Sequence, residues 1–544
     1  PETALVHEPR RTQMPEKSEL IITDAEVLDG SGGEARTRDI LVQDGRITAV
    51  EPPGVLPADS RPVLDAGRMT VAPGFIDVHS HADNAPLLRE DDTSKIRQGV
   101  TTEVVGNCGF SLAPCLPGNR QLLSRFTGRI FPAMDFDWTT WSELFEATDA
   151  SGYVTNYAPL VGHGTLRISA MGMDDRLPRP DELDTMGREL EQAMESGVFG
   201  MSTGLIYPPA VFSDASEITA LTRRLGPDGL YATHMRGEGG GLLDSVAEAL
   251  QVGRASGCRV HISHLKSSGR PNWGQMPQAL ELIHAAQADG VAVSKDVYPY
   301  TAASTMLTAT LPPPWLAGGD EETLERLSAH GAREELSRLI ETGLPGWDNM
   351  VLGCGWDGVL LSTTASHGYE GLTLAEVAAE RGEEPVDSLI HVLLSEELRA
   401  SMVTFAMNEE DLVHALADTD TVIGSDGLPP GTGGNPHPRM YGTFPRVLGR
   451  YVREREVLGL GQAVRRMTSL PAELFKIPDR GRVAPGYVAD LVAFDPGRVS
   501  DDCDYRDSDR PNAGIAWVMQ AGRTVVEGDR FLGVRHGSRL SPAS

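Results

Sequence analysis

The stretch Val71-Ala-Pro-Gly-Phe-Ile-Asp-Val-His-Ser-His81 is an apolar run that ends in a pair of histidines. Seven further apolar runs follow it, and stretches with helical character separate them. These runs are residues 100–106, 154–161, 198–202, 230–233, 259–263, 291–297 and 421–424. Continuous apolar runs between helices indicate parallel strands that are buried on both faces. Eight such units predict a closed (β/α)8 barrel of the TIM type over residues 70–476.

The two ends of the chain predict a second, smaller unit. Asp44-Gly45 lies between two short strand-like runs near the N-terminus, which is typical of a β-hairpin. Ala521-Gly522 lies in the same setting near the C-terminus. We therefore expect residues 18–69 and 477–535 to form one small β-sandwich domain.

Two further segments need a separate interpretation. The chain between the seventh and eighth strands is longer than a barrel connection requires, and it contains the Pro-rich stretch 311–315. Long connections inside compact domains are often functional, so we expect an inserted lid around residues 300–345. Residues 1–17 are polar and lack the apolar core of a signal peptide, and we expect a disordered or tag-like N-terminus.

Composition restricts the partners and the compartment. The 544 residues exceed one ordinary core, and the net charge of −29 is not offset by any run of Lys and Arg. Nucleic acid and anionic membranes need a basic face, so neither is an expected partner. No apolar run reaches the 18 residues of a membrane span. Five cysteines without a CxxC pair indicate a reducing, cytoplasmic compartment, while the oligomeric state stays open.

Side chains that bind metals follow six of the predicted strands, close to where each strand ends. They are His79, His81, Cys108, His163, His234, His264 and Asp426. Barrel active sites lie at the C-terminal ends of the strands. His79 and His81 are two residues apart, so both side chains can face the barrel axis. Imidazole and thiolate are ligands that suit zinc, which predicts a zinc site at this end of the barrel.

Each of these residues also has a structural explanation when it is taken alone. A buried cysteine is usually a small apolar side chain, and an Asp before Gly is often a turn former. A single histidine after a strand is equally well a structural residue, which leaves the role of His163 open. These explanations do not account for all of the residues together, because each of them follows a predicted strand of the barrel.

Five segments resemble a known family. Residues 72–81 resemble the first-strand signature of the amidohydrolase superfamily, and four others resemble the N-acyl-D-amino-acid deacylase (D-aminoacylase) family. Those four are Thr101–Pro114, Tyr231–Glu238, Ile262–Lys266 and Ile423–Gly427. The resemblance covers about residues 18–530. It implies zinc-dependent hydrolysis of the amide bond of N-acyl-D-amino acids, which are then the expected small-molecule partners.

The resemblance also implies roles for the ligand residues. Cys108, His234 and His264 would hold one tight zinc. His79, His81 and Asp426 would line a neighbouring position that is weakly occupied or empty, which leaves the metal count between one and two. Asp426 would act as the general base. Many superfamily members carry a metal-bridging Lys on the fourth strand, whereas residues 198–204 contain none and Cys108 takes its place. This difference argues against hydantoinases and dihydroorotases.

Five further residues match positions that contact the substrate carboxylate and neighbouring groups in the family. They are Tyr207, Lys266, Tyr298, Ser304 and Arg439. A guanidinium suits a bidentate grip on a carboxylate. The alternatives are packing around the barrel mouth for the two tyrosines and a surface salt bridge for Arg439.

Two other functions remain possible at this point. One is hydrolysis of a different amide, such as a cyclic amide, an N-carbamoyl group or a metabolite that contains a D-residue. The other is an inactive binding homologue that keeps the fold, although an intact ligand set argues against it. A serine nucleophile is not expected, because amide hydrolysis at a zinc site needs no covalent acyl-enzyme. The preferred side chain and acyl group are not predicted.

Overall fold

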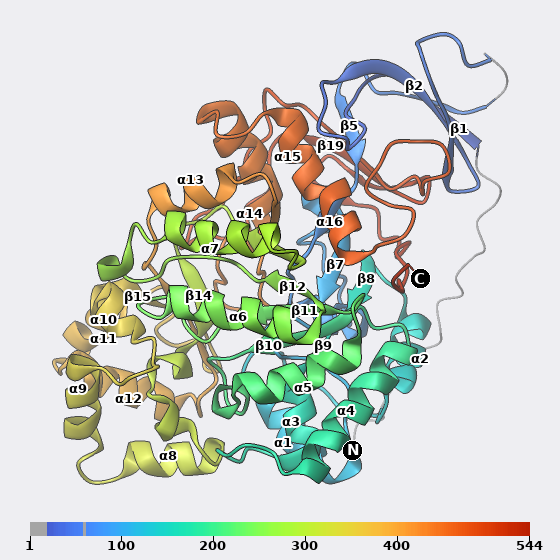
Figure 1. Cartoon of the computed structure of the whole chain (residues 1–544). Coiled ribbons are helices and arrows are strands. Elements are labelled where there is room, and N and C mark those ends of the chain that lie inside the picture. The colour runs from blue at the N-terminus through green and yellow to red at the C-terminus, as the bar shows by residue number, and fades with distance from the viewer. Residues whose placement is uncertain (1–18, 58–60, 544) are drawn as a thin grey trace, which may run out of the picture.

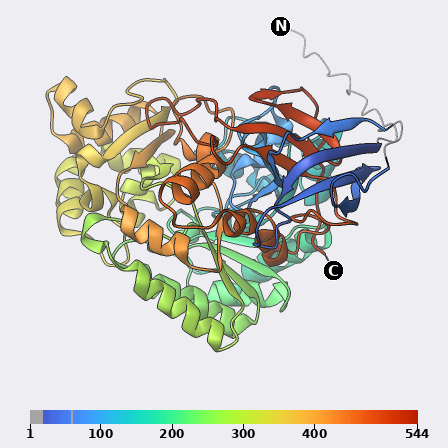
Figure 2. The same cartoon turned by 90° about the horizontal axis from the view of Figure 1, so that it is seen from above.

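The computed structural model describes residues 19–57 and 61–543. The N-terminal segment 1–17, for which we expected disorder, lies outside the described residues. A β-rich unit lies at one end of the molecule, a helical insertion lies at the opposite end, and a barrel lies between them (Figures 1 and 2). None of the helices in the described ranges combines the length and the apolar character that a membrane crossing requires.

The barrel contains all eight predicted strand regions. Its strands are β6 (Phe75–Asp77), β7 (Val100–Val105), β8 (Asn156–Pro159), β9 (Val161–Gly162), β10 (Gly200–Gly204), β11 (Leu230–His234), β12 (Arg259–Ile262), β13 (Val293–Val297) and β17 (Thr421–Ile423). They pair in parallel in the orders β6-β7-β8 and β9-β10-β11-β12-β13-β17. The two sheets meet at two places. Where β8 leads into β9, Leu160 N donates a hydrogen bond to Val105 O, and between β17 and β6, Asp426 N donates one to His79 O. The expected parallel barrel is confirmed.

The first predicted strand is divided between two sheets. Its start belongs to β5 (Thr70–Pro73), which pairs with the β-rich unit, and its end is β6 of the barrel. The chain passes from one to the other at Gly74, where a Cβ would lie 2.2 Å from Thr101 Oγ1. Because no side chain fits there, Gly74 lets the barrel and the β-rich unit pack against each other directly.

The helices follow the strands and cover the barrel. They are α1 (Arg120–Thr127), α2 (Trp141–Ser151), α3 (His163–Met171), α4 (Pro180–Glu195), α5 (Ala215–Leu225), α6 (Leu242–Ser256), α7 (Met276–Ala288), α13 (Glu409–Ala417), α14 (Arg439–Arg446), α15 (Leu460–Met467) and α16 (Ser469–Phe475). Helix α4 shows the amphipathic pattern, because Met186, Leu190 and Ala193 recur at helical spacing and are all buried. Helix α5 begins where Asp214 accepts hydrogen bonds from the backbone N–H groups of Ser216 and Glu217.

Both ends of the chain contribute to the β-rich unit. Its strands are β1 (Glu19–Val27), β2 (Arg36–Gln43), β3 (Arg46–Glu51), β4 (Val63–Asp65), β5, β18 (Leu491–Phe494), β19 (Ile515–Gln520), β20 (Arg523–Glu527) and β21 (Arg530–Phe531). Antiparallel pairing of β5 with β18 joins the N-terminal and C-terminal strands into one sheet. The sheet encloses a core that includes Ile40 and Trp517. Asp44 and Gly45 both have positive φ, as the predicted hairpin turn requires.

A large insertion separates β13 from β17. It consists of β14 (Ala303–Met306), η6 (Leu307–Thr310), α8 (Asp320–Ser328), α9 (Ala332–Thr342), α10 (Met350–Cys354), β15 (Val359–Thr364), α11 (Leu374–Arg381), α12 (Pro385–Ser395) and β16 (Ala400–Thr404). The three strands form an antiparallel sheet in the order β14-β16-β15. A separate core, which includes Leu336, Leu389 and Met402, lies inside the insertion. The expected lid around 300–345 corresponds to its first part.

Candidate metal centre

Six potential ligands converge at the C-terminal end of the barrel. The structure places them in two groups, one of His79, His81, Cys108 and Asp426 and one of Cys108, His234 and His264. Within each group the potential ligand atoms lie within 4.8 Å of one another. All six side chains are buried, and Cys108 belongs to both groups. The structure thus brings together every metal ligand that the sequence predicts.

The distances between ligand atoms match the size of a zinc ion. Cys108 Sγ lies 3.6 Å from His264 Nε2 and 3.3 Å from His79 Nε2. Asp426 Oδ1 lies 3.3 Å from His81 Nε2 and 3.4 Å from His79 Nε2. Neighbouring nitrogen and sulfur ligands of a tetrahedral zinc are separated by about 3.3–3.6 Å, given the usual bond lengths. The nitrogen and sulfur ligands are therefore spaced closely enough to share one ion.

Unsatisfied nitrogen atoms support the same conclusion. Neither ring nitrogen of His234 has a hydrogen-bond partner among the residues described, and the same is true of His81 Nδ1. A buried polar atom without a partner costs free energy, so such atoms are rare unless they bind something. A metal ion beside Cys108 would satisfy one of the two ring nitrogens of His234. The residues present therefore fit zinc, which prefers nitrogen and sulfur ligands.

Sharp turns at the strand ends point three of the ligands into the mouth of the barrel. Cys108, His264 and Asp426 have φ values of 53°, 37° and 50°, in the left-handed region that non-glycine residues rarely adopt. Each such conformation costs on the order of 1–3 kcal/mol. The turn at Cys108 also requires a glycine opposite it, because a Cβ at Gly204 would lie 2.1 Å from Cys108 O. The fold accepts this backbone strain at the ligand positions.

The charges around Cys108 favour a cation. Burial alone would raise the pKa of the Cys108 thiol, but His79, His234 and His264 outweigh it and hold the pKa well below its usual value. Burial alone would lower the pKa of His79, yet Cys108, Asp296 and Asp426 raise it well above the usual value. The thiolate is the form of cysteine that binds metals. The lowered pKa of Cys108 reflects the imidazoles around it, and the raised pKa of His79 reflects the anionic groups, whose negative charge a metal cation would neutralise.

Two carboxylates that were not among the predicted site residues contact Nδ1 of two of the histidine ligands. Glu238 Oε1 lies 2.9 Å from His264 Nδ1. Asp296 Oδ2 lies 3.5 Å from His79 Nδ1, and Asp296 Oδ1 accepts a hydrogen bond of 3.0 Å from His264 N. Histidine ligands usually donate their second ring N–H to a carboxylate, which fixes the ring orientation. Glu238 and Asp296 therefore act as positioning residues for the metal ligands.

A sequence signal existed for both residues. Glu238 ends the segment Tyr231–Glu238 that carries the family resemblance, four residues after His234. Asp296 lies on β13, one of the two strands after which no ligand was expected. His163, whose role the sequence left open, has another partner in the structure. Its Nε2 lies 2.8 Å from Glu217 Oε1, and it belongs to neither ligand group.

A cavity of about 640 Å³ opens above the ligands. Its lining includes Tyr207, Lys266, Tyr298 and Ser304, which are four of the five predicted substrate contacts. The Lys266 ammonium lies 2.6 Å from Glu238 Oε1, so these two charges form a buried pair at the cavity wall. A lining of apolar side chains with a few polar and charged groups is typical of a small-molecule site.

Arg439, the fifth predicted contact, lies behind this wall. Its side chain is 1% exposed, which rules out the alternative of a surface salt bridge. Its Nη1 lies 2.8 Å from Asp426 Oδ2, its Nη2 donates a 3.0 Å hydrogen bond to Ser304 O, and its guanidinium lies over the Tyr298 ring. Burial would raise the pKa of Asp426, but Arg439, His264 and His79 outweigh it and hold the pKa well below its usual value.

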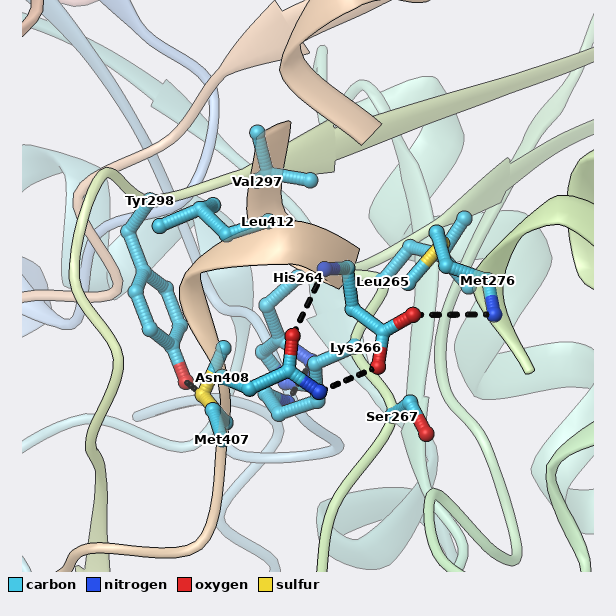
Figure 3. Close-up of a pocket in the computed structure, with 11 residues that line it drawn as sticks. His264, Leu265, Lys266, Ser267, Met276, Val297, Tyr298, Met407, Asn408 and Leu412 are labelled. Carbon is cyan, nitrogen blue, oxygen red and sulfur yellow. Dashed lines mark hydrogen bonds between the residues drawn. The ribbon is translucent and has the colours of Figure 1, made fainter. Parts of the chain in front are cut away.

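A second, smaller pocket of about 270 Å³ lies beside the ligand His264 (Figure 3). It shares His264, Lys266 and Tyr298 with the larger cavity. The Tyr298 hydroxyl points to Met407 Sδ, at 3.7 Å. Tyr298 thus forms a common wall of the two spaces.

Comparisons with known proteins agree with this geometry. The sequence profile of the amidohydrolase family matches residues 62–337 and 353–526. The chain is 36% identical to a D-aminoacylase of Alcaligenes xylosoxydans xylosoxydans, over 96% of this chain and 97% of that protein. It is 34% identical to an N-acyl-D-aspartate deacylase of the same organism, over 97% of this chain and 96% of the relative.

Solved structures show the same likeness. An N-acyl-D-glutamate deacylase from Bordetella bronchiseptica, in complex with zinc and a phosphonate inhibitor, matches with a TM-score of 0.80 and 35% identity, over 97% of this chain and 100% of that one. A D-aminoacylase with a binuclear metal centre matches with a TM-score of 0.80 and 35% identity, over 96% and 99%. For that protein, one-metal activation and second-metal attenuation are described.

We expect Cys108→Ala to lose most of its zinc, because this thiolate is the one ligand that both groups share. Elemental analysis of the purified variant measures the zinc content per chain. Cys258→Ala is the matched control, since Cys258 is equally buried but belongs to neither ligand group. Full zinc occupancy in Cys108→Ala would show that the assignment is wrong.

We expect Asp296→Asn to lower zinc affinity about 10–100-fold, which is the usual effect of removing a carboxylate behind a histidine ligand. Competition with a chromophoric chelator measures the affinity. Glu217→Gln is the control, because it removes a buried carboxylate from a histidine outside both ligand groups. Equal zinc affinity in the two variants would contradict the positioning role.

Proposed function

The chain belongs to the amidohydrolase family, and we propose that it hydrolyses the amide bond of N-acyl-D-amino acids in a zinc-dependent reaction. The products are a carboxylate and the free D-amino acid. The observation that carries the proposal is the position of Cys108, which joins two ligand groups beneath a cavity that Asp426 also lines. The relatives that share nearly the full length of the chain act on N-acyl-D-amino acids, as their names state.

Cys108, His234 and His264 would hold the tightly bound zinc, and these three protein ligands leave one coordination position open. Bound zinc polarises the scissile carbonyl and lowers the pKa of a water molecule. His79, His81 and Asp426 would line a weaker second position. The description of one-metal activation in the similar D-aminoacylase supports a single activating ion.

Asp426 has the position that a general base needs. One of its oxygens is held by Arg439, while Oδ1 faces His79 and His81 at the floor of the cavity. The carboxylate takes a proton from the attacking water at Oδ1 and passes it to the nitrogen of the leaving amine. Its lowered pKa keeps it ionised, and therefore able to accept that proton, at neutral pH.

The substrate carboxylate has candidate partners on one side of the cavity. Lys266, Tyr298 and Ser304 line this side, and Arg439 lies directly behind Ser304 and Tyr298. The Nε of Arg439 has no hydrogen-bond partner in the described part of the chain, so this buried guanidinium still has a donor to offer. Tyr207, whose hydroxyl is 2.7 Å from Thr305 Oγ1, would contact the substrate from the β10 side.

The insertion would act as a lid over this site. Asp348 accepts hydrogen bonds from the backbone N–H groups of Glu238 and Gly239, which ties the insertion to the loop that carries Glu238. Met306 and Met350 of the insertion line the cavity. Closure of such a unit excludes water from the reacting groups. The β-sandwich of residues 18–69 and 477–535 would support the 70–476 barrel from its opposite end.

The protein would work in a reducing compartment, which we propose to be the cytoplasm. All five cysteines are free thiols in the structure. Cys108 can bind zinc only while it stays reduced, since the thiolate is the ligand.

The direct test is a hydrolysis screen of the N-acetyl derivatives of D- and L-amino acids, with zinc content measured on the same sample. We expect turnover of D-substrates by the zinc-loaded protein and its loss on treatment with a chelator. Hydantoin and N-carbamoyl substrates complete the panel. Turnover of these compounds alone would identify a different amidohydrolase, and zinc-loaded protein without any turnover would contradict an enzymatic role.

We expect Asp426→Asn to lower kcat by about 10²–10⁴-fold, because positioned proton transfer contributes rate factors of this size. Asn keeps the shape of the side chain but cannot accept the proton. The variant should stay folded and keep near-full zinc, which circular dichroism and elemental analysis measure. Activity within a few-fold of the parent would exclude Asp426 as the base.

We expect Arg439→Ala to weaken transition-state binding of an N-acyl-D-amino acid by about 2–5 kcal/mol. Arg439 also contacts Asp426, so a part of this loss is shared by every substrate. Comparison of kcat/KM for the acid and for its carboxamide analogue separates the two effects. An equal loss for both compounds would exclude a carboxylate contact.

A further inference from the structure

We infer that the cavity selects N-acyl-D-amino acids with a neutral, apolar side chain and discriminates against those of D-aspartate and D-glutamate. The inference rests on the proposed function and specifies its substrate class. Overall sequence similarity does not indicate which substrate side chain is preferred. The chain is 34–36% identical both to a relative named for D-amino acids in general and to one named for D-aspartate. Among the solved structures at 35% identity, one is of an N-acyl-D-glutamate deacylase and another is of a D-aminoacylase.

The apolar residues that line the cavity come from two parts of the fold. Phe110, Ile130 and Ile206 come from the connections that follow β7 and β10. Met306 and Met350 come from the insertion. Because apolar side chains come both from the barrel connections and from the insertion, a substrate side chain in this cavity contacts mainly apolar atoms. Each methylene that fits such a wall adds favourable transfer free energy.

The hydroxyl groups in this wall offer little compensation for a charge. Ser304 Oγ already donates to Met402 O at 2.8 Å. Thr305 Oγ1 is bonded to the Tyr207 hydroxyl at 2.7 Å. Neutral hydroxyls that are already paired within the protein do not replace the hydration of a carboxylate.

The decisive feature is the number of cations. Lys266 is the only Lys or Arg among the residues that line the cavity, and Glu238 pairs with it at 2.6 Å. Arg439 behind the wall is the second available cation, and Asp426 pairs with it. The α-carboxylate, which every substrate of this class carries, would engage these two groups. A second carboxylate on the substrate would then enter without a partner.

The arginine that neighbours Ile130 is already engaged, and the chain around Met306 contains no cation. Arg129, the neighbour of Ile130 in the chain, is buried and bound to Asp320 through Nε at 3.0 Å. The segment that supplies the insertion side of the wall has no Lys or Arg between Lys295 and Arg326. A buried carboxylate without a partner is disfavoured by several kcal/mol, which corresponds to a rate difference on the order of 100-fold or more.

The test measures kcat/KM of the zinc-loaded protein for N-acetyl derivatives of D-leucine, D-methionine, D-glutamine, D-glutamate and D-aspartate. D-Glutamine is the matched comparison for D-glutamate, since the two differ in charge and little in shape. We expect D-leucine and D-methionine to exceed D-glutamate and D-aspartate by on the order of 100-fold. D-Glutamine should fall between them. Hydrolysis of D-glutamate or D-aspartate within tenfold of D-leucine would overturn the inference while leaving the proposed function intact. Absence of turnover for every D-substrate would overturn both.

A variant tests whether the apolar wall itself contacts the side chain. Met350 is half-buried at the start of α10 and lines the cavity, so a longer polar side chain fits there. We expect Met350→Lys to raise kcat/KM for D-glutamate relative to D-leucine at least tenfold, because it supplies the missing cation. Met350→Gln adds polarity without charge and is the control. An unchanged ratio in Met350→Lys, or the same change in both variants, would show that this wall does not contact the side chain and would overturn the assignment.

Discussion

The shared thiolate of Cys108 is the constraint on which the other features of the site depend. Its sulfur lies 3.3 Å from His79 and 3.6 Å from His264, so one atom links the ligands of three barrel strands. The sharp turn after β7 places it there, and Gly204 leaves the space that the turn requires. Negative charge on a buried sulfur is costly unless a cation compensates it. The surrounding imidazoles, and a metal ion in their midst, provide that compensation.

Two carboxylates extend this arrangement outward. Asp296 contacts His79 and the backbone of His264, and it also accepts a 2.8 Å contact from His261. Glu238 contacts His264 and Lys266 and receives the insertion through the bond of its backbone N–H to Asp348. Since one residue contacts a metal ligand, the carboxylate-binding side and the insertion, a shift of the insertion would be transmitted to the ligand geometry.

The pair of Arg439 and Asp426 connects binding with catalysis. A guanidinium that is 1% exposed needs a permanent anion, and Asp426 provides one at 2.8 Å. The same contact fixes the carboxylate that we propose as the base and places a donor near the substrate carboxylate. In the proposed mechanism, proton transfer and carboxylate recognition therefore both depend on one buried ion pair. A change at either residue affects both, which is why substrate analogues that differ in the charge of the carboxylate are needed to separate the two effects.

Local patterns in the sequence were sufficient to predict the barrel and to single out the side chains that converge at its C-terminal end. Apolar runs mark buried parallel strands regardless of their partners, and the connections of such strands place residues such as His79, Cys108 and Asp426 at one end of the barrel. The two hairpin signals and the motifs of the family resemblance were local in the same way. The tertiary structure alone decided the division of the first strand at Gly74, the extent of the insertion beyond residue 345, the support of His79 by Asp296 and the engagement of Arg439 with Asp426. These features depend on contacts between residues far apart in the chain, and the spacing of residues along one strand or helix carries no record of such contacts.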